Sequence, residues 1–360
     1  MNPTRRVILA GVAGLSLIAL SACGSDNGST TKTTSTKKVA CAKGQIAGAG
    51  STFQQNIEQQ WITDYGAQCA GAQINYQGTG SGAGIQQFGA GTIDFAGSDV
   101  TMKPDEQTKA DATCGSKALH IPVTAGGIAI MYNVKGVSTL NLSAKTLSGI
   151  FQGTITKWND PAIAADNPGS LPATPIAAYH RSDGSGTTSV FSGFLDANSG
   201  GDWKLGVGKQ LNFKGGQAAK GSDGVTAGVK QTDGAITYVE VSFAKANNLP
   251  TAKVKGAGSD FVDLTGDNVG KFLAASFSVT GTGNDLSGKL DFKGVVGYPI
   301  STVSYVIVCE KGKNAAKATL VKDYVDYAVN DGQVAADKLG FAPLPAAIGD
   351  KVKATAKTLS

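Results

Sequence analysis

Three short segments rich in glycine, serine and threonine stand where a strand-like run gives way to a helix-like pattern. They read GAGSTF at 48–53, GTGSGAG at 78–84 and HRSDGSGTT at 180–188. Glycine lets the chain turn sharply at such a point, and a serine or threonine hydroxyl can accept a hydrogen bond from a free N–H of the first helical turn. Repeated strand-to-helix junctions are typical of α/β folds. We therefore predict an α/β fold with mixed, mostly parallel sheets.

The same alternation continues along the sequence and indicates the order of elements. We expect strands at 44–51, 72–78, 92–99, 118–133, 174–180 and 298–310. We expect helices at 52–69, 81–91, 186–197 and 314–340, and a strand that leads into a helix within 234–248. The glycine pair Gly126–Gly127 interrupts the fourth strand, and we expect the chain to cross between two lobes there. About 320 residues follow the leader and tether, which is more than one core usually serves, so two lobes are expected.

The N-terminus has the features of an export signal. Arg5–Arg6 precede an apolar run at 7–20, and LSAC ending at Cys23 resembles a bacterial lipobox. We predict that residues 1–22 are a lipoprotein signal peptide and that Cys23 carries a lipid after cleavage. The segment 23–40 has hardly any apolar side chain and is expected to be a flexible tether. The mature protein is then anchored at the outer face of the cell membrane; general and twin-arginine export both fit the two arginines.

Charge and hydropathy exclude several classes of protein. The chain has 32 lysines and arginines against 27 aspartates and glutamates. Removing the two arginines of the leader leaves 30 against 27, a net charge of about +3, which is too weak to indicate nucleic-acid binding. No apolar run after the leader approaches the roughly twenty residues that a membrane helix needs.

The remaining cysteines indicate disulfides rather than a metal site. Four follow the leader: Cys41, Cys69, Cys114 and Cys309. An even number in an exported chain indicates two disulfides, with three possible pairings. We favour Cys69–Cys114 and Cys41–Cys309, because each pair flanks segments that we expect in one lobe. The chain has two histidines and no C-x-x-C pattern, so neither zinc nor another metal or cofactor is expected.

The three junctions also have the chemistry of an anion site. A helix N-terminus carries free N–H donors and a partial positive charge, and each junction taken alone is equally well explained as a helix cap. Three of them meeting at one point would hold a small tetrahedral oxyanion, and Arg181 would add a fork of donors. Asp99 would repel an anion unless the anion brought a proton to donate to it. Phosphate keeps a proton near neutral pH and sulfate does not, so Asp99 indicates phosphate.

These motifs resemble those of a known family. GAGSTF, NYQGTGSGAGI, TIDFAGSD, ITKWNDPAI, HRSDGSGT and GAITYVE resemble the phosphate-binding subunits of bacterial phosphate ABC transporters, the PstS-type periplasmic-binding proteins. The resemblance begins near Gly48 and continues to the C-terminal helices. Carried over position by position, it implies these phosphate ligands: Thr52, Phe53 through its backbone N–H, Ser81, Asp99, Arg181, Ser185, Gly186 and Thr187. It implies that Asp183 pairs with the arginine. His180 and Gly82–Ala83 depart from what is usual in the family.

The resemblance also implies an architecture and partners. It implies a type II-like periplasmic-binding-protein fold, with two lobes joined by two hinge crossings and the ligand in the cleft between them. The first lobe would comprise 41–125 and 298–360, and the second 126–297. The implied function is high-affinity binding of inorganic phosphate outside the cytoplasm and delivery to the permease subunits of an ABC importer. The protein is expected to be a monomer without catalytic residues.

Other functions stay open at this stage. Ser185 and Ser81 lie in glycine-rich turns, as a serine-dependent phosphoester hydrolase would require, but neither fits G-x-S-x-G and no histidine is an evident base. No nucleotide-binding loop is present. A binding protein for sulfate or molybdate would share the fold and differ in the ligand. An adhesin or a phosphate-sensing protein would share both.

Overall fold

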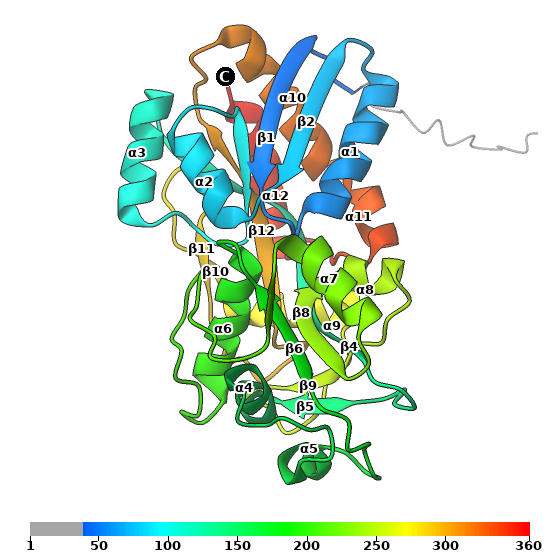
Figure 1. Cartoon of the computed structure of the whole chain (residues 1–360). Helices are drawn as coiled ribbons and strands as arrows, with labels where there is room; N and C mark the ends of the chain where they lie inside the picture. Colours follow the sequence, from blue (N-terminus) through cyan, green and yellow to red (C-terminus); the bar gives the residue numbers. More distant parts are fainter. Residues whose placement is uncertain (1–38) are drawn as a thin grey trace, which may run out of the picture. The chain divides into compact units, whose positions relative to one another are not determined.

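A computed structural model describes one unit of the chain, residues 39–360 (Figure 1). The predicted signal peptide, Cys23 and all but the end of the tether lie outside the described residues. No helix among residues 39–360 is long and apolar enough to cross a membrane. The unit is built on an eight-stranded sheet in the order β2-β1-β3-β12-β4-β8-β6-β7.

The sheet is mixed, as the sequence predicts. β1 is parallel to β2 and β3, and β6 is parallel to β7 and β8, whereas β12 and β4 run antiparallel to their neighbours. Its strands are β1 (Gly44–Gly50), β2 (Ala72–Gly78), β3 (Phe95–Ser98), β4 (Ala118–Asn133), β6 (Ala177–Arg181), β7 (Gln217–Ala219), β8 (Ala235–Glu240) and β12 (Ser301–Cys309). Two small sheets pair β5 (Asn141–Ser143) with β9 (Lys253–Lys255) and β10 (Phe277–Val279) with β11 (Gly288–Leu290).

Strand β4 joins the two halves of the sheet. Its first part pairs with β12 as far as Gly127, and its second part, from Ile128, pairs with β8. The expected break at Gly126–Gly127 does not occur, because β4 runs without interruption through both glycines. The glycines leave room for neighbours instead: a Cβ on Gly127 would lie 2.1 Å from a methyl of Leu264. The second crossing lies beside the first, since the Ile128 N–H donates to the carbonyl of Ile300 at 2.7 Å.

We call the half containing β1, β2, β3, β12 and 118–127 of β4 the first lobe. Its helices are α1 (Gln55–Gln68), α2 (Ser81–Gly89), α3 (Pro104–Cys114), α10 (Ala315–Val329), α11 (Gln333–Leu339) and α12 (Ala346–Thr358). Ile57, Trp61 and Tyr65 recur every four residues in the sequence, as on one face of a helix, and all three are fully buried in α1. The helix begins at Gln55 rather than at 52, since the preceding turn is held by a bond from the Phe53 N–H to the Ser51 hydroxyl at 3.0 Å.

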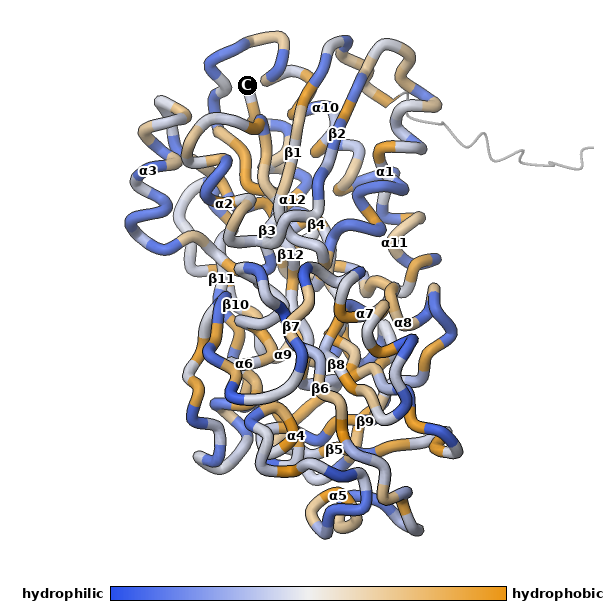
Figure 2. The backbone as a smooth tube through the Cα atoms, in the orientation of Figure 1, coloured by the Kyte–Doolittle hydropathy of each residue, from blue (hydrophilic) through white to orange (hydrophobic). Residues whose placement is uncertain are grey.

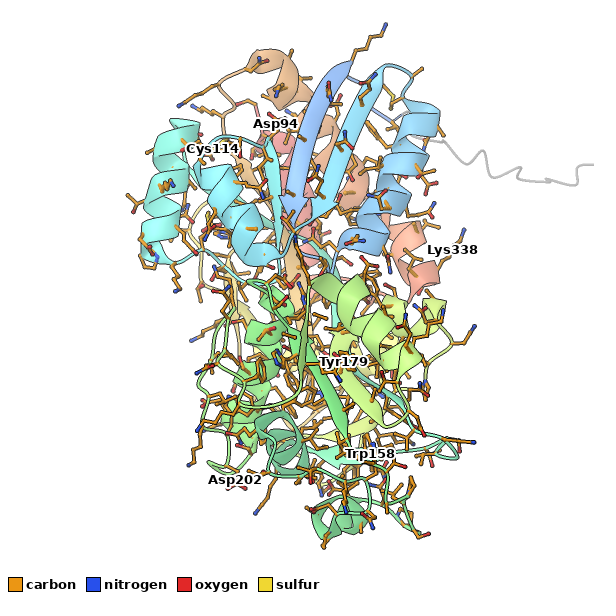
Figure 3. All side chains as sticks on the ribbon, in the orientation of Figure 1. Asp94, Cys114, Trp158, Tyr179, Asp202 and Lys338 are labelled. Carbon is orange, nitrogen blue, oxygen red and sulfur yellow. A yellow bond between two sulfur atoms is a disulfide. The ribbon has the colours of Figure 1, made fainter. Side chains whose placement is uncertain are left out.

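The second lobe contains 128–133 of β4, β5 to β9 and the remaining helices. These are α4 (Ala144–Gln152), α5 (Pro161–Asp166), α6 (Gly186–Asn198), α7 (Gly221–Gln231), α8 (Val241–Ala246) and α9 (Gly266–Ser276). Its core includes stacked rings of Phe191 and Tyr238, with centroids 4.4 Å apart, and the buried Trp158 that is labelled in Figure 3. Figure 2 shows mostly hydrophilic residues along β2 and α3 of the first lobe and more hydrophobic residues along β1.

The lobe boundaries at 125/126 and 297/298 stay a prediction, and one segment complicates them. The turn between β10 and β11 falls in the range expected for the second lobe. It is nevertheless bonded to the first lobe: the N–H of His120 donates to Asp285 at 2.9 Å, and the N–H of Leu286 donates to the carbonyl of His120 at 3.0 Å. The hairpin therefore bridges the two halves beside the central strands.

The four cysteines form two disulfides, but the favoured pairing is wrong. The bonds are Cys41–Cys69 and Cys114–Cys309, with Cα atoms 5.1 and 5.4 Å apart. Cys41 precedes β1 and Cys69 follows α1, so the packing of α1 beside this end of the sheet brings them together. Cys309 lies opposite Ala118 in the β12–β4 pairing, next to the end of α3, where Cys114 is labelled in Figure 3. Pairing follows strand register, which cysteine spacing does not reveal.

Candidate anion-binding site

The three glycine-rich junctions meet where the two lobes face each other. They lie between β1 and α1, between β2 and α2, and between β6 and α6. The Gly82 N–H at the start of α2 donates across the lobe boundary to the carbonyl of Gly184 at 2.7 Å. The Gly186 N–H at the start of α6 donates to the Ser81 hydroxyl at 3.2 Å. A Cβ on Gly186 would lie 2.5 Å from that hydroxyl oxygen, so glycine is needed for this approach.

Asp99 lies at the centre of this meeting point and its two carboxylate oxygens differ. Oδ1 accepts hydrogen bonds from the hydroxyls of Ser51 and Ser304, both at 2.5 Å. Oδ2 has only long contacts, 3.4 Å from the Ser81 hydroxyl and 3.5 Å from the Thr187 hydroxyl. Oδ1 is therefore fixed by the protein, and Oδ2 is the oxygen turned toward the other predicted ligands, where it can accept a proton.

The surroundings of Asp99 set its charge. The residue is 3% exposed, and burial raises the pKa of its carboxyl above the ordinary value of 3.8. The hydroxyls of Ser304 and Ser51 and the charge of Arg181 oppose this rise, because each stabilises the carboxylate form. These partners favour a buried carboxylate that can accept a hydrogen bond.

Arg181 ends β6 and is held by Asp183. Its side chain is 1% exposed; Nε donates to Asp183 Oδ1 at 2.7 Å and Nη2 donates to Oδ2. Burial alone would raise the pKa of Asp183, but the bonds and charge of Arg181 outweigh it and hold that pKa below its ordinary value. The expected pairing is thus confirmed. It uses the Nε–Nη2 edge of the guanidinium, so the Nη1 edge is the part that can bind an anion.

The N-terminus of α6 supplies neutral donors. Ser185 is the N-cap, and its hydroxyl oxygen accepts from the Thr188 N–H at 3.1 Å while its own O–H can still donate. Its backbone N–H is already bonded to the carbonyl of Lys209 at 2.9 Å. Gly186 and Thr187 follow in the first turn, where backbone N–H groups have no partner within the helix. This end of the helix is therefore the expected place for an anion in the second lobe.

The first lobe brings Thr52 and Phe53 to the same boundary. The Thr52 hydroxyl lies 2.8 Å from the Ser222 hydroxyl and accepts from the Ser222 N–H at 3.1 Å. Phe53 is fully buried, and its ring packs edge-on against Phe341 with centroids 5.9 Å apart. The side chain of Phe53 thus belongs to the core, and only its backbone faces the junction.

Sequence reasoning missed four contributors. Ser51 lies within the GAGSTF motif, but the motif does not indicate that its hydroxyl donates to Asp99. Ser304 makes the matching bond from β12, 205 positions along the chain from Asp99, and no local pattern marks it. Gly221 and Ser222 open α7, and the Gly221 N–H donates to Asp183 at 2.9 Å. A fourth strand-to-helix junction at 217–222 was the available signal for this pair.

No group of three or more histidine, cysteine, aspartate or glutamate residues within 39–360 is arranged to hold a metal ion. The site instead contains one guanidinium, its carboxylate partner, a second carboxylate and a set of hydroxyl and N–H donors. Such a set can bind a small oxyanion that carries a proton.

Comparison with known proteins gives consistent matches. The model of the PBP superfamily domain matches residues 35–331. Phosphate-binding protein PstS 3 of Mycobacterium leprae is 40% identical over 354 residues, 95% of each chain. Phosphate-binding protein PstS 2 of Mycobacterium tuberculosis is 40% identical over 366 residues, 97% of this chain and 98% of the relative. The solved structure of PfluDING, a high-affinity periplasmic phosphate-binding protein bound with phosphate at pH 8.5, is similar with a TM-score of 0.69 and 25% identity, over 86% of this chain and 93% of that one.

Proposed function

We propose a role in phosphate transport for this chain, which belongs to the PBP superfamily and, within it, to the PstS phosphate-binding proteins. It binds inorganic phosphate with high affinity outside the cytoplasm and delivers it to an ABC-type phosphate importer. The observation that carries this proposal is the position of Asp99: Oδ1 is saturated by two hydroxyls, while Oδ2 faces donors that suit an anion. An anion accepted there must bring its own proton.

The phosphate ligands in this proposal come from both lobes. They are Thr52, Phe53 through its N–H, Ser81 and Asp99 from the first lobe, and Arg181, Ser185, Gly186 and Thr187 from the second. The Phe53 N–H donates to the Ser51 hydroxyl at 3.0 Å in this structure, so in the proposal it exchanges or shares that bond with the anion. Phosphate should favour the closed arrangement of the two lobes, because only in that arrangement can the donors of both lobes reach one anion. The lobe boundaries given above and a monomeric state are part of the same proposal.

The family is one of transporter substrate-binding proteins, and we propose that this chain has no catalytic activity. A hydrolase would need a base directed at Ser185, and His180 is engaged elsewhere. Its ring stacks on Phe213 with centroids 4.2 Å apart, and its Nδ1 lies 3.3 Å from the carbonyl of Arg181. Ser185 therefore serves as a helix cap and hydrogen-bond donor. The lipid anchor at Cys23 likewise remains a proposal, supported by the LSAC sequence alone.

Isothermal titration calorimetry and thermal shifts with a panel of oxyanions test the function. Phosphate at a thousand times its dissociation constant should stabilise the protein by about 4 kcal/mol. Sulfate and molybdate should give no comparable shift. A protein that shows no selective shift with phosphate would refute the proposal, and release of phosphate from a chromogenic ester, abolished in Ser185→Ala, would favour a hydrolase instead.

A further inference from the structure

The loop at 199–216, between α6 and β7, contacts both the predicted phosphate ligands and the opposite lobe. Phe213 in this loop stacks on His180, the neighbour of Arg181. The N–H of Gly208 donates to the Ser192 hydroxyl of α6 at 3.3 Å, which fixes the middle of the loop on that helix. The loop is thus packed against the elements that present Arg181 and Ser185.

Lys209 makes two different contacts from this loop. Its backbone carbonyl accepts the N–H of Ser185 at 2.9 Å, which orients the N-cap of α6. Its side-chain Nζ donates to Glu106 Oε1 in α3 of the first lobe at 2.7 Å. One residue therefore links the donor turn of the second lobe to a charged group on the first.

The carboxylate of Glu106 is fixed by a hydrogen bond within its own helix. Its Oε2 accepts the N–H of Lys103, the N-cap of α3, at 2.8 Å, and this bond does not depend on Lys209. A fixed partner loses less side-chain entropy when an ion pair forms. The pair is also largely withdrawn from water: the Lys209 and Glu106 side chains are 16% and 20% exposed, against 43% and 58% for Lys253 and Asp263 within the second lobe.

The other bonds between the lobes near the site involve neutral donors. The amide of Asn56 donates to the Ser242 hydroxyl at 2.7 Å, and the Gly82 N–H donates to Gly184. These bonds join the lobes beside α1 and α2, whereas the ion pair of Lys209 joins them beside α3. We propose that Lys209 is a positioning residue that holds the lobes closed over bound phosphate by pairing with Glu106.

This inference rests on the proposed phosphate-binding function. A contact made only in the closed state stabilises that state and slows release, while ligand capture by open lobes is left unchanged. Lys209→Met should therefore raise the phosphate dissociation rate about fivefold and weaken affinity by the same factor, with the association rate unaltered. Lys209→Arg should keep the wild-type rate.

Stopped-flow tryptophan fluorescence and calorimetry on the mature protein provide the test, with phosphate as the probe. Glu106→Gln keeps the bond to Lys103 but loses the charge, so it should match Lys209→Met. The double variant with Lys209→Met and Glu106→Gln should release phosphate no faster than either single variant, because both remove the same ion pair. Lys253→Met is the matched control. In about 1 M salt the wild type should still release phosphate more slowly than Lys209→Met, because a pair that is largely withdrawn from water is screened much less than an exposed one.

The outcomes separate the two proposals. A wild type that does not bind phosphate contradicts the function itself. A wild type that binds phosphate while Lys209→Met and Glu106→Gln both release it at the wild-type rate overturns the role of Lys209. If Lys209→Met loses phosphate binding and Lys209→Arg loses it as well, the loop acts only through folding, and this result also overturns the role of Lys209.

Discussion

Replacement of Asp99 by asparagine tests the chemical basis of selectivity. In the wild type, Oδ1 is held by Ser51 and Ser304 at 2.5 Å, so the asparagine oxygen should take over these bonds and place its NH₂ where Oδ2 now lies. A donor then replaces the acceptor that faces the ligand. Sulfate, which has no proton at neutral pH, should gain a hydrogen bond where it previously met a buried carboxylate. Phosphate should still bind, because its oxygens also accept.

The expected magnitude follows from the contacts of Oδ2. Its nearest donors, the hydroxyls of Ser81 and Thr187, lie at 3.4 and 3.5 Å, too far to satisfy the charge when no ligand proton is present. An unsatisfied buried charged acceptor costs about 3–5 kcal/mol, which corresponds to a roughly 10²- to 10⁴-fold preference for phosphate. In Asp99→Asn this preference should fall to about tenfold or less.

Calorimetric titration with phosphate and with sulfate, followed by competition between them, measures the ratio. Asp94→Asn is the control, because Asp94 is an ion-paired aspartate of the first lobe that lies outside the site. Burial raises the pKa of Asp99, so the wild-type carboxyl gains a proton as pH falls through that raised pKa and then becomes a donor. Sulfate affinity of the wild type should therefore increase at low pH, and that of Asp99→Asn should not. A variant that rejects sulfate as strongly as the wild type would refute the reasoning.

Three further predictions concern packing and stability. Gly186→Ala places a Cβ 2.5 Å from the Ser81 hydroxyl oxygen, so calorimetry should show at least about tenfold weaker phosphate binding with an unchanged fold; wild-type affinity would contradict the close approach. Burial raises the pKa of Glu58 to about 7, so stability should fall as pH rises from about 4.5 to 7. Glu58→Gln should remove this fall and add about 3 kcal/mol to the free energy of unfolding at pH 7.5. Denaturant titrations in which the stability of the wild type and of Glu58→Gln changes in parallel with pH would contradict this prediction. Loss of Cys114–Cys309, which closes a span of 195 residues, should lower the free energy of unfolding by about 5 kcal/mol. Loss of Cys41–Cys69, with a span of 28, should lower it by about 3.5 kcal/mol. Equal losses in variants that lack one disulfide each would argue against chain entropy as the cause.

The secondary structure could be predicted where local pattern and tertiary packing agree. The strand-to-helix junctions, the buried fourfold stripe of α1 and the mixed sheet follow from periodicity and turn residues alone. The pattern misleads at Gly126–Gly127, where the glycine pair predicts a break in the strand and β4 runs through both residues. Those glycines are needed because side chains from elsewhere, such as Leu264, pack against the strand, and that crowding is a property of the folded chain.

The site was predictable where its members repeat a local pattern. Ser81 and Gly186 each lie in a glycine-rich turn, and the structure joins them by a hydrogen bond across the boundary. Ser304 and Lys209 carry no such mark, because each acts from an element whose sequence only specifies a buried strand or a surface loop. The pairing of Cys114 with Cys309 could not be predicted for the same reason, because it depends on the register of β12 against β4.

The balance of charge in the site explains why anion binding depends on the tertiary arrangement of the donors and not on residue types alone. Arg181 is neutralised by Asp183, and Asp99 adds a further negative charge, so these three side chains do not attract an anion by net charge. Attraction must come from N–H and O–H dipoles, which act over short distances and only when they point at one place. Turns from three separate junctions are brought to that place by the packing of α1, α2 and α6 on their strands. A sequence can show that each turn is able to donate, but only the packed lobes decide that the donors converge.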